Sequence, residues 1–249
     1  MSAHERLREP FSEPLKTTLI RLCIAIVFSI AFGYIEAAVV VYLREIFHPD
    51  GFTFPMTVFG NDAASLRILL TEIGREAATI VLIFTGAWLF GRSRQQRLAY
   101  FLVIFAIWDI FYYIWLKVLL DWPTSIMDWD ILFFIPVTWA SPVFYPILIS
   151  MTLFMFAVVI LHCSSFARPI KTTFRDWLAF SLSALIVIES FCIGGVHITE
   201  SDYASYFHQW LFVVGYLLGL ATFLVCLVQS GLGREVPKMP IIDDDVDTL

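Results

Sequence analysis

Six long stretches of hydrophobic residues divide the chain, and each is close to the length that crosses a bilayer. They cover residues 18–43, 68–91, 97–119, 143–162, 174–193 and 207–229. A helix needs about 20 predominantly apolar residues to cross the hydrocarbon core of a membrane. The pattern therefore predicts an all-α fold, a polytopic membrane protein built as a bundle of six transmembrane helices.

The segment before the fourth predicted helix is too long for a single crossing. Residues 131–167 contain no Asp, Glu, Lys or Arg, and as one helix they would extend over roughly 55 Å. Three prolines, Pro136, Pro142 and Pro146, interrupt this stretch, and proline breaks or kinks a helix. We therefore expect 131–140 to lie in the membrane interface or to form a re-entrant segment before helix four.

Basic residues predict the orientation of the helices. Twelve of the 16 Lys and Arg residues lie in the N-terminal segment, in the second and fourth connections, and near the C-terminus. The other four are Arg44, Arg67, Arg75 and Lys117. Because Lys and Arg concentrate on the cytoplasmic side of membrane proteins, we expect both termini in the cytoplasm. This arrangement is that of a multi-pass protein of a bacterial-type inner (plasma) membrane.

Composition agrees with this assignment and limits the number of domains. The chain is 59% hydrophobic and 15% charged, whereas soluble domains carry about 25% charged residues. We expect a cytoplasmic segment at 1–17, one transmembrane domain at 18–229, and a tail at 230–249. The tail contains Asp243, Asp244, Asp245 and Asp247, and a short acidic segment of this kind is predicted to be disordered.

Net charge and cysteine spacing exclude several functions. The formal charge of −6 gives no basis for nucleic-acid binding, which requires basic patches. The expected partners are instead membrane lipids, together with a membrane-protein partner or a second copy of the chain. The four cysteines lie far apart in or beside apolar segments, which is typical of small core residues rather than of disulfides or zinc sites.

Ionisable residues within the predicted helices concentrate in the outer half of the membrane. They are Glu36, Glu72, Arg75, Glu76, Asp109, Lys117 and Glu189. A charge in hydrocarbon costs several kcal/mol and therefore faces a partner or a wet cavity. We expect an outward-facing pocket rich in carboxylates, in which Glu36, Asp109 and Glu189 are the candidate catalytic residues.

Two helices carry the candidate binding residues. Glu72 and Glu76 are spaced i, i+4 and repel unless something neutralises them; Arg75 can reach one of them. On the third helix, Asp109, Tyr113 and Lys117 share one stripe with Tyr112 beside it, and the two tyrosines and the lysine are candidate hydrogen-bond donors. Each group is a candidate substrate or ion site, and the alternative interpretation is a fixed ion pair or hydrogen bond that only holds the bundle together.

Such a set of carboxylates has three uses. It can bind a cation, for which oxygen ligands suit Mg²⁺, Ca²⁺ or Mn²⁺, while His197 and His208 would extend the choice of divalent metal to Zn²⁺ or Fe. It can hold protons for transport, or perform acid–base chemistry on a lipid or isoprenoid substrate. Haem is not expected, because only His197 and His208 lie at matching depth and the usual ligand pattern is absent.

The sequence leaves the reaction open. It predicts a membrane-embedded enzyme or binding protein that acts on a lipid-like or cationic ligand. The alternatives are a small transporter, or an accessory subunit of a larger membrane complex in which the charges are structural pairs. A transporter needs a polar path through the membrane, and the inner half of the predicted bundle offers few polar residues. This shortage favours an enzyme or a binding site.

Overall fold

The computed structural model describes residues 15–48, 51–55, 63–135, 137–166 and 168–231. The helices are α1 (Leu15–Phe47), α2 (Ala63–Phe90), α3 (Arg94–Leu120), α4 (Phe144–Ser165), α5 (Phe174–Val196) and α6 (Gln209–Gln229). A two-stranded sheet of β1 (Trp129–Phe133) and β2 (Trp139–Pro142) precedes α4, and a short 3-10 helix, η1 (Tyr203–Tyr206), precedes α6. A helix therefore occurs at each of the six predicted positions.

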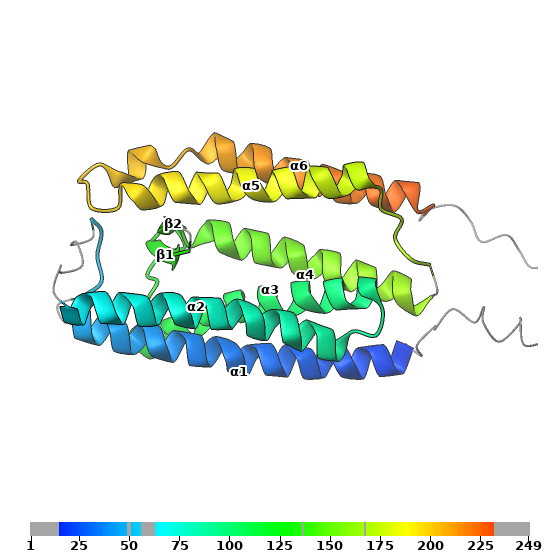
Figure 1. Cartoon of the computed structure of the whole chain (residues 1–249), viewed down its shortest axis with the longest axis horizontal. Coiled ribbons are helices and arrows are strands. Elements are labelled where there is room, and N and C mark those ends of the chain that lie inside the picture. Colours follow the sequence, from blue (N-terminus) through cyan, green and yellow to red (C-terminus); the bar gives the residue numbers. More distant parts are fainter. Residues whose placement is uncertain (1–14, 49–50, 56–62, 136, 167, 232–249) are drawn as a thin grey trace, which may run out of the picture.

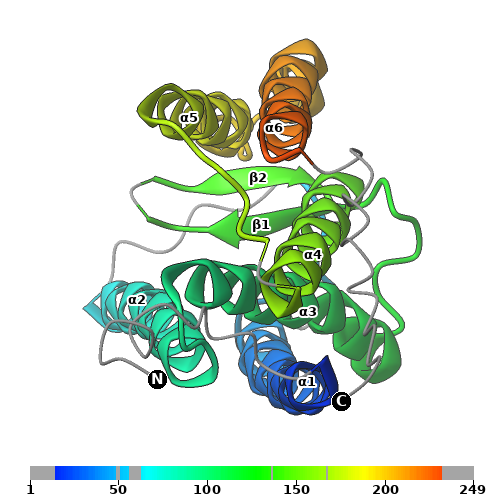
Figure 2. The ribbon, with the colours of Figure 1, turned by 90° about the vertical axis from the view of Figure 1, so that its right-hand side faces the viewer.

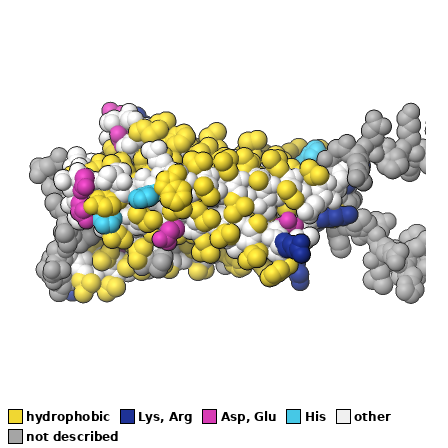
Figure 3. All heavy atoms as spheres, turned by 90° about the horizontal axis from the view of Figure 1, so that it is seen from above, with side chains coloured by type: hydrophobic (Ala, Val, Ile, Leu, Met, Phe, Trp, Pro, Cys, Tyr) yellow, Lys and Arg dark blue, Asp and Glu magenta, His cyan; other side chains and the backbone are white. Residues whose placement is uncertain are grey.

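Among the described residues, five helical segments are long and apolar enough to cross a membrane. They are Leu15–Phe47, Arg94–Leu120, Phe144–Ser165, Phe174–Val196 and Tyr203–Gln229. The face of the molecule formed by α5 and α6 is mostly hydrophobic along its middle, and charged side chains gather toward its ends (Figure 3). These features are those of a multi-pass membrane protein.

The helices run side by side and form two groups. α3 is central to the first group, since it packs against α1, α2 and α4, while α5 and α6 pack against each other. Figure 2 shows the first group on one side of the molecule, the α5–α6 pair on the other, and the β-hairpin between them. We call the end of the bundle where this hairpin lies the hairpin end.

Local signals explain where two of the helices begin. The Ser93 hydroxyl caps α3 by accepting a hydrogen bond from the Gln96 N–H. At α5, Thr173 and Asp176 form a reciprocal capping box. Such caps satisfy N–H groups that have no partner in the first turn of a helix, so they fix the points at which the chain reverses before α3 and before α5.

The segment expected to be interfacial or re-entrant is an antiparallel β-hairpin. Trp129 pairs with Pro142, and Ile131 with Ala140. Pro146 lies in the first turn of α4, where a helix makes no use of the missing N–H. Pro142 and Pro146 therefore mark the beginning of α4, and the described residues before them are extended. Pro136 lies outside the described residues.

Two glycines allow the hairpin to lie directly against α5. A Cβ at Gly195 would collide with the carbonyl oxygen of Thr138, and a Cβ at Gly194 would lie 2.9 Å from the carbonyl oxygen of Ala140. Only glycine permits such a close approach of two backbones. The hairpin is thereby fixed against the α5–α6 pair.

The predicted terminal segments fall largely outside the described part of the chain. Residues 1–14 and 232–249 are not described. The cytoplasmic segment at 1–17 and the disordered acidic tail at 230–249 therefore stay predictions.

Candidate functional site

A cavity of about 870 Å³ lies between the two helix groups. Its lining extends from Arg44 and His48 at the hairpin end to Gln95 and Ile170 near the opposite end. Most of the lining side chains are apolar, and the charged ones come from α1, α2, α3 and the hairpin. The cavity therefore has a polar region near the hairpin and an apolar region away from it.

Two of the helices that line the cavity, α2 and α5, carry exposed apolar residues. Ile80 of α2 and Trp177 of α5 both line it, and they are 42% and 47% exposed. Exposed apolar side chains on two such helices suit contact with the hydrocarbon core of a bilayer.

Arg75 neutralises two of the predicted carboxylates at once. Its guanidinium forms ion pairs with Glu36 of α1 and with Glu72 of its own helix, and its Nε donates a hydrogen bond of 2.9 Å to Glu72. The Thr79 hydroxyl donates to Glu36 at 3.3 Å. The structure thus brings together Glu36, Glu72 and Arg75, which the sequence had placed on two separate helices.

Glu76 has a different partner. Both oxygens of its carboxylate accept from the Phe134 N–H at 3.0 Å, so Glu76 links α2 to the hairpin. The expected repulsion between Glu72 and Glu76 is therefore relieved, since Arg75 pairs with Glu72 and a backbone N–H bonds Glu76.

A second ion pair joins α1 to the hairpin. Arg44 and Asp130 are both buried, and their charged groups are 3.0 Å apart. The Tyr112 hydroxyl donates to the other oxygen of Asp130 at 3.2 Å. The Arg44 guanidinium also lies over the rings of Phe52 and Trp122, 4.0 Å and 3.8 Å from their centroids.

Neither Arg44 nor Asp130 was predicted from the sequence as a site residue. The signal for Arg44 was its position on the same helical face as Glu36, two turns further along. Asp130 carried no such signal, because it lies in a connection whose path the sequence could not define. Both line the cavity.

His48 and Asp128 are among the groups outside the helices that have shifted pKa values. Burial and the nearby Arg44 guanidinium lower the pKa of His48, so this imidazole is neutral at pH 7. Burial alone would raise the pKa of Asp128, but hydrogen bonds from the Ser125 and Thr124 backbone N–H groups and from the Thr124 hydroxyl outweigh it and lower the pKa. Asp128 therefore holds the turn that leads into β1 as a carboxylate.

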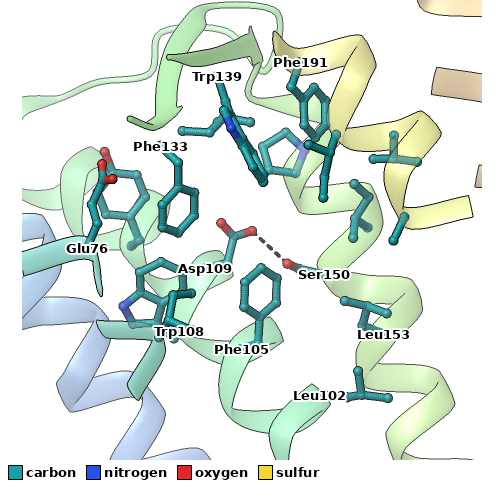
Figure 4. A pocket seen from close by; sticks show the side chains of 18 of the residues that line it. Glu76, Leu102, Phe105, Trp108, Asp109, Phe133, Trp139, Ser150, Leu153 and Phe191 are labelled. Atoms are coloured by element: carbon teal, nitrogen blue, oxygen red, sulfur yellow. Dashed lines mark hydrogen bonds between the residues drawn. The ribbon is translucent and has the colours of Figure 1, made fainter. Parts of the chain in front are cut away.

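Asp109 occupies a different position from the other acids. Its carboxylate points into the cavity, and the Ser150 hydroxyl of α4 donates to it at 2.8 Å (Figure 4). It forms no ion pair with any residue that the structure describes. Tyr112 and Tyr113, expected as its donors, both line the cavity, but the Tyr112 hydroxyl bonds to Asp130 instead.

Four predicted site residues do not line this cavity, namely Lys117, Glu189, His197 and His208. Glu189 is exposed on α5, because the face of that helix toward the cavity carries Val187, Ile188 and Phe191. Lys117 is also exposed and pairs with Asp121 at 2.7 Å. Neither residue joins Asp109, so the expectation of a single pocket containing all of these charges is corrected.

The two histidines form local contacts at the connection between α5 and α6. His197 pairs with Glu200 at 2.7 Å and stacks on Tyr206, and the His208 ring nitrogen contacts the Tyr206 carbonyl oxygen at 2.6 Å. In the described part of the chain, no group of three or more His, Cys, Asp and Glu side chains could hold a metal ion. The geometry therefore does not connect these histidines with the carboxylates.

Aromatic rings bridge the two helix groups at the hairpin end. Phe52 contacts Trp122 with ring centroids 5.8 Å apart, and Phe54 contacts both Trp129 and Tyr203 at 6.0 Å and 5.3 Å. The Phe52 and Phe54 rings also contact each other. These contacts connect the end of α1 with the segment before α6.

Comparison of the chain with protein-family models, with curated proteins and with solved structures finds no match. The function must therefore be inferred from the geometry of the cavity.

Proposed function

We propose that this integral membrane protein binds a lipid-like amphiphile in the cavity between the two helix groups. The observation that carries this proposal is the Asp109 carboxylate, which projects into an otherwise apolar part of the cavity. Ligand sites are typically cavities of about 300–1,000 Å³ with mainly apolar walls and a few polar groups that fix the ligand's orientation. A volume of about 870 Å³ lies within this range.

The walls separate the cavity into parts that suit the two ends of an amphiphile. Away from the hairpin, Leu98 and Leu102 of α3 face a cavity that Phe156 and Ile160 of α4 also line. From Leu98 to Asp109 the helix rises by about 16 Å. A hydrocarbon chain can lie along this apolar part while the polar group lies near Asp109.

The same walls favour a binding site over a transport path. An ion crossing a membrane needs polar groups along its whole route. The charged lining residues all lie from Asp109 toward the hairpin end, and the rest of the described lining is predominantly apolar. This distribution supports a site that a ligand enters and leaves from one side.

The proposed topology has six crossings, with α2 as the sixth. α2 has 28 residues, or about 42 Å of helix, and it lies beside α1 (Figure 1). With the basic connections inside, both termini face the cytoplasm of a bacterial-type inner membrane, and the hairpin extends into the outer half of the bilayer. Reporter fusions after Arg94 should report a cytoplasmic location; an external location would overturn this orientation.

The binding proposal is tested with a photoreactive probe. Hexadecanol carrying a diazirine on its chain is added to the protein in phospholipid nanodiscs, and the labelled residues are identified by mass spectrometry. We expect labelling of the cavity-lining leucines Leu98, Leu102 and Leu153. Leu153→Trp fills the cavity and should reduce this labelling about tenfold, a change of about 1.4 kcal/mol.

The matched control is Met155→Trp. Met155 is on the same helix but is exposed on the outer surface, so this substitution should leave the labelling of the cavity unchanged. Equal labelling in the two variants, or labelling confined to exposed residues in the wild type, would refute the binding site.

A further inference from the structure

The part of the cavity around Asp109 is surrounded by four aromatic rings. Phe105 contacts Trp108 with ring centroids 5.8 Å apart, Trp108 contacts Phe133 at 6.3 Å, and Phe133 contacts Trp139 at 5.6 Å. All four rings line the cavity. We call this set the aromatic box.

The residues of the aromatic box come from α3 and from the hairpin, on either side of the carboxylate. Phe105 and Trp108 come from α3, as does Asp109, whereas Phe133 and Trp139 come from the two strands of the hairpin. In Figure 4 the Asp109 carboxylate lies among these rings, and the ring nitrogen of Trp108 points away from it. The carboxylate therefore receives no hydrogen bond from the Trp108 ring nitrogen, which, like that of Trp139, is buried without a partner among the described residues.

Asp109 keeps one oxygen free for a ligand. The Ser150 hydroxyl donates to Oδ2 at 2.8 Å, and no residue in the described ranges donates to Oδ1. The environment of the side chain is otherwise apolar. A ligand group that donates hydrogen bonds or carries positive charge would complete this site.

The charges that line the cavity select further among ligand groups. Two guanidinium groups, those of Arg44 and Arg75, accompany five carboxylates, which belong to Glu36, Glu72, Glu76, Asp109 and Asp130. Each guanidinium is already paired with a carboxylate. An anionic headgroup such as a phosphate would therefore meet repulsion and find no free cation, whereas a cationic headgroup would be attracted.

We infer that the amphiphile carries an ammonium headgroup, bound by the Asp109 carboxylate and the faces of the aromatic box. This inference rests on the proposed function, because it names the chemical class of the ligand of the same cavity. Carboxylates attract ammonium groups directly, and the electron-rich faces of Trp and Phe rings attract cations in a desolvated site. The chain of the ligand extends from this site toward Leu102 and Leu153, which line the cavity beyond the box.

The test compares three probes that differ only in the headgroup. Hexadecylamine, hexadecanol and hexadecanoate, each with a diazirine on the same chain carbon, are added to the protein in nanodiscs. We expect the amine to label the cavity about tenfold more than the alcohol, and the carboxylate to label it least. Asp109→Asn should lower labelling by the amine about tenfold and leave labelling by the alcohol within about twofold.

A second carboxylate within a helix provides the matched control. Glu189→Gln removes an acid that is exposed on α5, and it should not change the labelling by any probe. If Asp109→Asn fails to fold, Phe133→Leu keeps the acid and removes one ring of the box, and it should still lower labelling by the amine.

The outcomes separate this inference from the proposed function. Labelling of the cavity by all three probes to the same extent, or most strongly by the carboxylate probe, overturns the ammonium headgroup and leaves the amphiphile site standing. Absence of cavity labelling with every probe overturns both. Loss of amine labelling in Glu189→Gln as large as in Asp109→Asn would show only a general effect of membrane charge, and would also overturn the inference.

Discussion

The two walls of the cavity are built from different kinds of side chain. The wall formed by α1–α4 and the hairpin carries Asp109 and the ion pairs of Arg44 and Arg75 with their carboxylates. The described lining residues of α5 and α6 include no charged side chain and are mostly apolar or small. The difference indicates that the first wall supplies the charged groups of the site, and that the α5–α6 wall encloses the cavity with apolar side chains.

The walls also differ in how they are held. Buried ion pairs and hydrogen bonds to the hairpin connect α1, α2 and α3. The α5–α6 wall is held mainly by close packing, at Gly194 and Gly195 against the hairpin and at the stacked rings of Phe156 and Phe223, whose centroids are 3.8 Å apart. Substitutions in the two walls should therefore act through different mechanisms and with different sizes.

The largest effect is expected for Asp130→Asn in the charged wall. This change leaves the buried Arg44 guanidinium without its counter-charge, and removing one partner of a buried ion pair costs about 3–5 kcal/mol. The free energy of unfolding in mixed micelles is the measurement. The control is Asp121→Asn, which breaks the pair of Asp121 with Lys117; these side chains are 91% and 49% exposed, so stability should not change. Equal losses would show that burial does not distinguish the charged wall.

A smaller effect is expected for Gly195→Ala in the apolar wall. The new methyl group collides with the Thr138 carbonyl oxygen and must push the hairpin away from α5, and overpacking of this kind costs about 1–3 kcal/mol. Gly74→Ala on α2 meets no atom within 4 Å and should be neutral, or stabilising by up to about 1 kcal/mol. Thermal unfolding of the two variants checks this, and a stable Gly195→Ala variant would contradict close packing as the means by which this wall is held.

The smallest effect is expected for Tyr216→Phe. The Tyr216 hydroxyl of α6 shares a hydrogen bond of 2.8 Å with Thr152 of α4, and Thr152 also bonds to the Leu148 carbonyl of its own helix. Hydrogen bonds between membrane helices contribute about 0.6 kcal/mol on average, so unfolding should shift only slightly. Tyr42→Phe, at an exposed tyrosine of α1, should cause no shift. A loss as large as that of Asp130→Asn would mean that polar contacts also hold the second wall.

The sequence predicted the positions of the helices more fully than it predicted the site. The lengths of the apolar stretches located the six α-helices of the described residues, and the spacing of Glu72, Arg75 and Glu76 correctly indicated that Arg75 neutralises one of its neighbours. The sequence also placed Asp109 among the ionisable residues of the expected pocket, and Figure 4 shows its carboxylate inside the cavity.

The directions of the side chains could not be predicted in the same way. In a membrane helix the faces toward lipid and toward other helices are both apolar, so periodicity did not show that Glu189 is exposed while Phe191 lines the cavity. The hairpin was missed because its strands are only five and four residues long and do not alternate regularly between apolar and polar residues. Because the hairpin was not predicted, the sequence also did not reveal the partner of Arg44 or two of the four rings of the aromatic box. These residues, Asp130, Phe133 and Trp139, all belong to the two strands.

The apolar surface around the cavity bears on how occupancy of the proposed site should be expressed. If the proposed amphiphile reaches the cavity from the hydrocarbon phase, for which the exposed lining residues Ile80 and Trp177 are suited, the quantity that drives binding is its mole fraction among the lipids rather than its molarity in water. Diluting the same amount of ligand into more bilayer should empty the site even when the aqueous volume is constant. Saturation curves from nanodiscs of different lipid content should therefore superimpose only when plotted against ligand per lipid.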